Sequence, residues 1–339
     1  MNRIKAAVLA VAVAASAAGA LGRAEAQETV RVGYSAHFNT GLPLYLSQVK
    51  PDIFEKHGIK LDLVDMRGSA ANCVAAMLSD AVDACSIGTT AGTAAVAEGA
   101  ALKVIAMLQG PVIEMYLSKA AAAKTGVAAS AAPLDRIKGL KGLDMITAPP
   151  GTAYYVILND VLHNAGMSMS DVRFRALVDQ VAMKEGLRNG TFEAVLWGSG
   201  AFSDLDQSGE AVRWLSVPRG DLPDYAGMPL VTVYANEKWI AAKPEAIDKL
   251  RAALVEAAAA LKADDGTLSA AIKAKYYPDL PQANWDDAVK TGVAVLRPNA
   301  DVTEKDWNAL ITLQEASAPG KDYGRVRWDA VVLPVAQAK

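Results

Sequence analysis

Residues 76–88 read AMLSDAVDACSIG, and residues 186–198 read GLRNGTFEAVLWG. Both stretches pass from the end of a helical segment through a short turn to an acidic residue followed by alanine, and both close with an apolar strand and a glycine. A helix that leads into a buried strand is part of the unit from which parallel α/β sheets are built. The near-repeat therefore predicts the same α/β unit twice, once in each of two lobes.

Strands and helices alternate on both sides of each copy. Around the first copy, apolar periodicity predicts strands at 29–34, 59–66, 83–88 and 102–108, with helices at 42–56, 69–79 and 89–99. Around the second copy it predicts strands at 143–148, 172–178 and 193–197, with helices at 152–165 and 180–189. This order requires mainly parallel sheets with helices on their faces, so the predicted fold class is α/β with two lobes and two parallel-rich sheets.

The remaining segments fix how the chain passes between the lobes. Residues 111–133 hold a short strand and an Ala/Ser/Lys-rich surface excursion, and a strand returns within 228–239. The tail is helical at about 243–263, 266–275, 283–296 and 303–316, and we expect it to wrap over the first lobe. Crossings near 110–118 and 220–232 then give residues 27–115 with 228–339 as lobe 1 and 116–227 as lobe 2.

The N-terminus has the form of a signal peptide. Arg3 and Lys5 precede an apolar stretch from Ala6 to Leu21, and AEA at 24–26 fits a cleavage site after Ala26. The apolar stretch is short for a membrane helix, which needs roughly 20 strongly apolar residues. We therefore expect residues 1–26 to be a cleaved signal peptide and the mature protein to be periplasmic.

The charge balance excludes one class of partner. The formal net charge is −3 for the whole chain, and loss of residues 1–26 with their three basic residues and one acidic residue makes it −5. Nucleic-acid binding requires a basic stripe, and the sequence shows none. Cys73 and Cys85 are the two cysteines, and in an oxidising compartment they form a disulfide or remain as two buried small side chains.

The loops after the predicted strands are the candidate binding site, because ligands of open parallel sheets lie beyond the carboxyl ends of the strands. These loops share Gly, Ser, Thr and Asn and contain almost no acids. Several helix N-termini aimed at one crevice would attract an anion. As an alternative, Ser69 and Thr152 are simple helix N-caps. The loops are residues 34–41, 67–72, 88–92, 149–155 and 197–200.

For several side chains in these loops, the sequence allows both a ligand-binding role and a purely structural role. His37 would donate a hydrogen bond to a ligand carboxylate or sulfonate, or it is a solvated loop residue. Arg67 would bind the ligand through two hydrogen bonds, or it pairs with Asp62 or Asp65 on the surface. Tyr154, Tyr155 and Trp197 would stack on a planar ligand; Trp197 is favoured, since a tyrosine in an amphipathic helix also fits the core.

Signatures of catalysis are weak. The histidines are His37, His57 and His163, without metal-ligand spacing, and the chain contains no nucleotide-binding glycine motif. The stretch GTTAG at 88–92 has the outline of a nucleophile elbow with Thr90 in the serine position, but only His163 follows it. The sequence therefore predicts no catalytic residue, no metal site and no cofactor.

The order and spacing of four stretches, 58–106, 140–177, 186–200 and 233–261, resemble a known family. The chain is similar to the periplasmic binding proteins of ABC importers for nitrate, sulfonates and taurine, which include binders of thiamine-pyrimidine precursors. The resemblance implies a type II two-lobed fold that closes over its ligand like a flytrap, with two crossover hinge segments.

Carried over by position, the resemblance implies a set of ligand-binding residues in the loops chosen above. The chain departs from the pattern after Trp197, where many sulfonate binders have Asp-Pro and this sequence has Gly198 and Ser199. The resemblance therefore does not fix the ligand. The implied residues are Ser35, His37, Asn39, Thr40, Arg67, Gly68, Ser69, Thr89, Thr90, Gly151, Thr152, Tyr154, Trp197, Gly198 and Ser199.

The function predicted from these observations is that of a monomeric, non-enzymatic receptor. It would close over a small organic anion, a sulfonate or carboxylate that can be aromatic, and deliver it to an ABC permease driven by an ATPase. Two alternatives stay open at this point: a thiamine-pyrimidine precursor binding or synthesis protein, the latter an enzyme, and a ligand sensor without transport.

Overall fold

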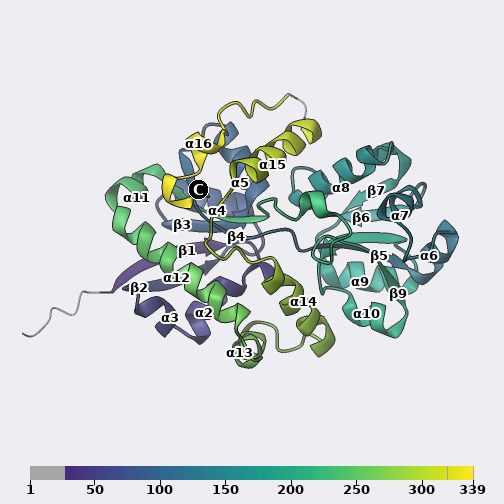
Figure 1. Cartoon of the computed structure of the whole chain (residues 1–339), viewed down its shortest axis with the longest axis horizontal. Coiled ribbons are helices and arrows are strands. Elements are labelled where there is room, and N and C mark those ends of the chain that lie inside the picture. The colour runs from purple at the N-terminus through teal and green to yellow at the C-terminus, as the bar shows by residue number, and fades with distance from the viewer. Residues whose placement is uncertain (1–26, 319, 339) are drawn as a thin grey trace, which may run out of the picture.

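The computed structural model describes residues 27–318 and 320–338, and it shows two lobes, each a sheet covered by helices (Figure 1). The predicted signal peptide, residues 1–26, lies outside the described residues. Within the described part of the chain, no helix has the length and apolar character needed to cross a bilayer.

The first lobe is built on a five-stranded sheet in the order β2-β1-β3-β10-β4. β1 pairs in parallel with β2 and β3, and β10 runs antiparallel to both β3 and β4. The strands are β1 (Glu28–Tyr34), β2 (Ile59–Asp65), β3 (Ala84–Gly88), β4 (Leu102–Gln109) and β10 (Val231–Asn236), and the first helices around them are α2 (Leu42–Val49), α3 (Asp52–Glu55), α4 (Ala70–Leu78) and α5 (Thr89–Ala97).

The second lobe repeats this plan with a sheet in the order β7-β6-β8-β5-β9. β6 pairs in parallel with β7 and β8, while β5 runs antiparallel to β8 and β9. The elements are β5 (Ile113–Ser118), β6 (Asp144–Thr147), β7 (Arg173–Ala176), β8 (Ala194–Gly198), β9 (Ala211–Ser216), α6 (Lys119–Thr125), α7 (Pro133–Lys138), α8 (Ala153–Asn164), α9 (Gln180–Asn189) and α10 (Ser203–Ser208).

The two sheets correspond strand for strand, which confirms the repeated α/β unit. The near-repeat ends in β3 and in β8, and each occupies the third place of its sheet. In each sheet the fourth strand is the one that arrives from the other lobe, β10 in the first and β5 in the second, and it runs against its neighbours. The sheets are therefore mixed: the first three strands of each are parallel, and the strand that follows a crossing from the other lobe is antiparallel to its neighbours.

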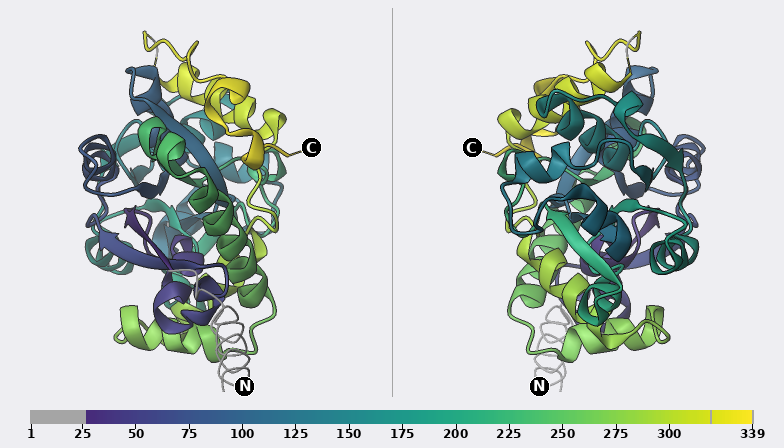
Figure 2. Two further views of the ribbon diagram at one scale, coloured as in Figure 1. Left: turned by 90° about the vertical axis from the view of Figure 1, so that its left-hand side faces the viewer. Right: turned by 90° about the vertical axis from the view of Figure 1, so that its right-hand side faces the viewer.

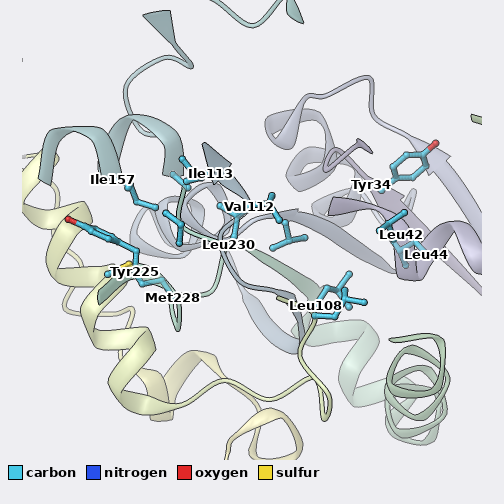
Figure 3. Packing of buried hydrophobic residues seen from close by; sticks show 14 of the residues in the cluster. Tyr34, Leu42, Leu44, Leu108, Val112, Ile113, Ile157, Tyr225, Met228 and Leu230 are labelled. Atoms are coloured by element: carbon cyan, nitrogen blue, oxygen red, sulfur yellow. The ribbon is translucent and has the colours of Figure 1, made fainter. Parts of the chain in front are cut away.

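The first crossing segment is buried, whereas the second is buried near its two ends and partly exposed between them. The chain leaves the first sheet after Gln109 and re-enters it at Val231, so the crossings are residues 110–112 and 217–230. Val112 and Leu230 from these segments belong to one apolar cluster with residues of both lobes (Figure 3). β5 begins at Ile113 in the second sheet, and the lobe limits at 115/116 and 227/228 stay a prediction.

The C-terminal tail covers more than the first lobe. α12 packs on α2 and α3, as expected for a tail that wraps lobe 1, and Figure 2 shows the green and yellow tail extending over that lobe. α14, however, contacts α10, and α15 contacts α8, so both also touch the second lobe (Figure 1). The elements are α11 (Glu237–Ala242), α12 (Pro244–Lys262), α13 (Thr267–Tyr276), α14 (Gln282–Ala294), α15 (Glu304–Ser317) and α16 (Trp328–Val331).

The two cysteines form a disulfide, which decides between the two alternatives. Cys73 lies on α4 and Cys85 on β3, with their Cα atoms 6.0 Å apart and their sulfur atoms bonded at 2.00 Å. Both side chains are fully buried. The bridge fastens α4 to the strand that follows it, so the helix after the second strand-end loop is held against the sheet.

Candidate functional site

Three of the predicted loops lie together at the carboxyl ends of β1, β2 and β3. Ser35 N donates to Ser86 O at 3.1 Å, and Met66 N donates to Tyr34 O at 3.0 Å. His37 Nε2 lies 3.1 Å from a carboxylate oxygen of Asp65, which ends β2. The loops after these neighbouring strands therefore form one continuous edge of the first lobe, as the strand-end argument predicts.

Two further loops meet on the second lobe. The rings of Tyr154 and Trp197 stack with centroids 5.0 Å apart and an interplanar angle of 14°. A Cβ at Gly198 would lie 3.4 Å from the Tyr154 hydroxyl. Burial raises the pKa of Tyr154 to about 12, so its hydroxyl stays protonated at neutral pH. Tyr155 instead packs edge-on against Phe174, with centroids 5.3 Å apart.

The loops of the two lobes join at Asn39 and Ser199. Asn39 Nδ2 donates to Ser199 O at 3.2 Å and to Ser199 Oγ at 3.0 Å, and both residues are buried. Ser199 Oγ also shares a hydrogen bond of 2.7 Å with Thr291 Oγ1 of α14. Two residues predicted to bind ligand thus contact one another and bring one loop from each sheet together.

The hydroxyls of Ser69 and Thr152 cap their own helices. Ser69 Oγ accepts from Asn72 N at 3.1 Å, and Thr152 Oγ1 accepts from Tyr155 N at 3.3 Å. The starts of α4 and α8 are therefore capped by their own side chains, because an extended N-cap residue places its hydroxyl over the first turn. The alternative of simple N-caps is confirmed.

The start of α5 is the one among these three helices that lacks a side-chain cap. Its N-cap residue is Gly88, and a Cβ built there would meet no atom within 4 Å. Thr89 and Thr90 are buried, and Thr89 N donates to Leu230 O at 3.0 Å. The amides that follow Thr89 carry the positive end of the helix dipole beside an open space, which suits an anion.

Arg67 is the exposed cation of the site. Its backbone N donates to Asp65 Oδ1 at 2.7 Å, and its φ of 51° together with 75° at Gly68 makes a left-handed turn. Within residues 27–318 and 320–338 its guanidinium forms no ion pair, so the predicted surface pairing with Asp62 or Asp65 is not present. The guanidinium is available to a ligand, whereas His37 Nε2 lies 3.1 Å from Asp65 Oδ1 without forming a hydrogen bond.

Gly151 and Gly198, two of the predicted site residues, have no side chain and contribute the shape of the backbone. Thr40, a third predicted residue, forms a hydrogen bond within its own loop. Gly151 has a φ of 87° and is exposed, with no atom within 4 Å of a built Cβ. Gly198 is buried beside Tyr154. Thr40 Oγ1 donates to His37 O at 2.5 Å and so closes the turn that contains Asn39.

Aromatic residues of the C-terminal tail belong to the site and were not predicted. Tyr277 OH accepts from Phe38 N at 2.6 Å and shares a hydrogen bond of 2.8 Å with Tyr45 OH. The rings of Trp285 and Tyr277 lie 5.7 Å apart, and Phe38 has a strained φ of 60°. Strand-end reasoning misses these residues because they follow helices of the tail; the paired tyrosines of the stretch YYP at 276–278 are the available signal.

A partly buried ion network holds α14 to the second lobe. Asp287 of α14 accepts from Arg213 Nη2 at 2.7 Å and from Ser203 Oγ at 2.5 Å, and it also pairs with Arg219. Glu114 on β5 is fully buried and accepts from Arg219 Nε at 3.1 Å. Burial alone would lower the pKa of Arg213, but the charges of Glu114 and Asp287 raise it, so this guanidinium stays charged.

Comparison with known proteins assigns the chain to a family. Residues 42–266 match a family model described as NMT1/THI5 like. The chain belongs to the NMT1/THI5-like family. No curated protein matches it. The expected resemblance to this group of binding proteins is confirmed, and among the described residues no cluster of His, Cys, Asp or Glu has the arrangement of a metal site.

Solved structures share the fold of this NMT1/THI5-like chain at low identity. The periplasmic aliphatic sulphonate binding protein SsuA of Escherichia coli has a TM-score of 0.69 and 14% identity, covering 92% of this chain and 92% of that chain. The alkanesulfonate-binding protein SsuA of Xanthomonas axonopodis pv. citri, bound to MOPS, has a TM-score of 0.66 and 17% identity, covering 88% and 98%. The periplasmic nitrate-binding protein NrtA of Synechocystis PCC 6803 has a TM-score of 0.58 and 16% identity, covering 78% and 69%. The fold is that of the periplasmic binding proteins.

Proposed function

We propose that the protein is the solute-binding receptor of an ABC importer, which closes over a small organic anion and presents it to a membrane permease. The observation that carries the proposal is the meeting of strand-end loops from both sheets at Asn39 and Ser199. A site divided between two lobes encloses a ligand when the lobes approach, and ligand binding then favours the closed form over the open one.

The chemistry of the loops favours an anion. The uncapped start of α5 offers backbone amides, and Arg67 offers a guanidinium without an ion pair among the described residues. The stacked pair of Tyr154 and Trp197 would supply a flat apolar wall. The neighbours that bind sulfonates and nitrate share this fold, which supports an oxyanion as the ligand class.

In this proposal the protein binds its ligand without transforming it, and no residue has a catalytic role. The solved neighbours named above are binding proteins. Export by the predicted signal peptide 1–26 would place the receptor in the periplasm, as a monomer that meets the permease from outside. Thr89, Thr90, Gly151 and Gly198 would shape the site through their backbone, while Ser35, His37 and Thr40 would hold the first loop.

A calorimetric titration of residues 27–339 tests the proposal. The panel contains nitrate, methanesulfonate, taurine, benzenesulfonate and benzoate, and we expect micromolar binding of at least one of them. Arg67→Gln should weaken that binding by about tenfold, since a hydrogen bond to a charged group contributes roughly 1.5–3 kcal/mol.

The matched control for Arg67→Gln is Arg325→Gln, which removes another exposed arginine, one that lies in the C-terminal tail. This variant should bind like the unmodified protein. The proposal fails if the whole panel gives no heat of binding, or if Arg67→Gln and Arg325→Gln bind the best anion equally well.

A further inference from the structure

A cavity lies between the lobes next to the joined loops. Its volume is about 480 Å³, within the range of roughly 300–1,000 Å³ that is usual for small-molecule sites, which favour interfaces between domains. One wall is the first half of α9 in the second lobe; the other is the tail segment between α13, which packs on α2, and α14. The lining residues are Gln180, Val181, Lys184, Glu185, Ala201, Tyr276, Tyr277, Pro278, Asp279, Leu280, Pro281 and Asn284.

The lining side chains that are free to contact a ligand are mainly apolar. Val181 in the first turn of α9 is 73% exposed, and Tyr276, Tyr277 and Leu280 of the tail line the same cavity. An exposed valine gains from burial by a partner, at about 25 cal/mol per Å² of apolar area. Apolar contact is therefore the main interaction that this cavity can offer.

The polar side chains of the lining are largely engaged with the protein. Lys184 Nζ lies 2.5 Å from Asp204 Oδ2, and Glu185 Oε1 lies 2.5 Å from Arg188 Nη1. Asn284 Nδ2 donates to Ala201 O at 2.8 Å. These three groups already have partners, whereas no such contact of Gln180 or Asp279 is present among the described residues, and the carboxylate of Asp279 does not favour an acid group inside the cavity.

The aromatic wall is fixed in place. The Tyr276 ring stacks on Tyr45 with centroids 4.2 Å apart at 25°, and the Tyr277 hydroxyl is held by Phe38 N and Tyr45 OH. Rings that are already oriented lose little freedom when a ligand binds, so their contact area contributes more fully to affinity. Phe38 follows His37 directly, so this wall adjoins the first strand-end loop.

We propose that this cavity receives an aromatic ring or another planar apolar part of the ligand, while the acid group of the same molecule is held at the strand-end loops. The inference rests on the proposed receptor function and narrows its ligand class to aryl sulfonates and aryl carboxylates. Ala201 and Phe38 connect the two parts. Ala201 lines the cavity and directly follows the loop 197–200, and Phe38 lies within the loop 34–41 and donates through its backbone N to the Tyr277 hydroxyl of the cavity wall.

Calorimetry with matched ligands tests the cavity. Benzenesulfonate and benzoate are compared with methanesulfonate and acetate, and benzamide serves as a neutral aromatic probe. We expect the aryl acids to bind at least about tenfold more tightly than their small counterparts, because a buried ring removes much apolar area from water.

Two substitutions of the exposed Val181 test whether the aryl ring binds in this cavity. Val181→Gln removes the apolar wall and Val181→Trp fills the cavity, and each should weaken aryl binding about fivefold or more while leaving methanesulfonate unchanged. The matched control is Val178→Gln, since Val178 is 64% exposed, precedes the same helix and does not line the cavity. It should leave all affinities unchanged, and thermal melts check that each variant is folded.

The outcomes separate the cavity from the receptor function. Equal affinity for benzenesulfonate and methanesulfonate, with no effect of either Val181 variant, overturns the cavity proposal and leaves the receptor function standing. Benzamide binding that responds to Val181→Gln, without binding of any anion, supports the cavity and refutes the anionic ligand class. Absence of binding by all five probes overturns the cavity proposal, and it overturns the receptor function as well if nitrate and taurine also give no heat of binding.

Discussion

Replacement of Asp287 by asparagine tests how the tail is fastened to the second lobe. The Asp287 side chain is 11% exposed and pairs with Arg213 on β9 and with Arg219 just beyond that strand. Its oxygens accept from Arg213 and Ser203 and pair with Arg219. Asparagine keeps the shape of the side chain but removes the charge and one acceptor.

The expected loss in free energy of unfolding depends on the ion pairs that Arg213 and Arg219 keep in the variant. A hydrogen bond to a charged group contributes roughly 1.5–3 kcal/mol, and removal of one partner of a buried pair costs about 3–5 kcal/mol. Arg213 keeps Asp206 at 3.0 Å and Glu114 at 3.3 Å, and Arg219 keeps Glu114 at 3.1 Å. Because neither guanidinium is left alone, we expect Asp287→Asn to lower the free energy of unfolding by about 2 kcal/mol.

Urea unfolding measures this loss, with Asp286→Asn as the control. Asp286 is the exposed neighbour on the same helix and, among the described residues, accepts a hydrogen bond from Gln282 alone, at 2.7 Å, so its loss should change stability by no more than about 0.5 kcal/mol. The deficit of Asp287→Asn should persist in about 0.5 M salt, which screens exposed pairs far more than buried ones. Equal stability of the two variants at both salt concentrations would refute the ion network as the fastening of α14.

Three further predictions concern the bridge, a carboxylate and the aromatic pair. Replacing Cys73 and Cys85 by alanine together should lower the free energy of unfolding by about 3 kcal/mol in urea titrations, since the bridge closes a loop with a sequence separation of 12. Hydrogen bonds from the amides of Leu268 and Ser269, at 2.9 Å each, outweigh burial and lower the pKa of Asp264. Its contribution to stability is therefore present above the unfolded value near pH 4 and lost as the pH falls through the folded pKa, so urea midpoints of Asp264→Asn should fall less than those of the unmodified protein on acidification. Trp197→Ala should reduce the affinity for a bound aryl acid by about 1–3 kcal/mol in calorimetry; an unchanged affinity would mean that the ring only packs on Tyr154.

Much of the fold could be predicted because its signals are local. The near-repeat at 76–88 and 186–198 identifies equivalent strands, and apolar periodicity locates most of the surrounding helices and strands. The helices α6, α7 and α10 were not predicted, and α6 lies in the stretch that was expected to be a surface excursion. β9 and β10 show the limit. β9 was not predicted at all, and the antiparallel place of β10 depends on pairing with β3 and β4, more than 100 residues away in the chain. Such pairing is set by tertiary contacts that no local pattern contains.

The site shows the same division between local and tertiary information. Loops such as 35–40 and 197–200 could be predicted because strand ends of a parallel sheet must meet at one edge. The roles of single side chains could not, since Thr152 turns its hydroxyl to its own helix and Asn39 bonds to the opposite lobe. Tyr276 and Tyr277 reach the site only through the packing of α13 on α2, which is a property of the folded chain.

The Asn39–Ser199 contact also bears on how a ligand would act. The two hydrogen bonds join the lobes while the start of α5 and the Arg67 guanidinium keep their capacity for an anion. A hydrogen bond contributes about 0.5–1.5 kcal/mol net, so the contact favours the joined lobes by only about five- to 150-fold. For these two bonds taken alone, that preference leaves an open population through which a ligand can enter, and the ion network of Asp287 adds to the attachment of the lobes. Contacts that the ligand makes with both lobes at once would add further closing energy, and a rigid planar acid that reaches from the strand-end loops to the cavity beside Val181 would make them.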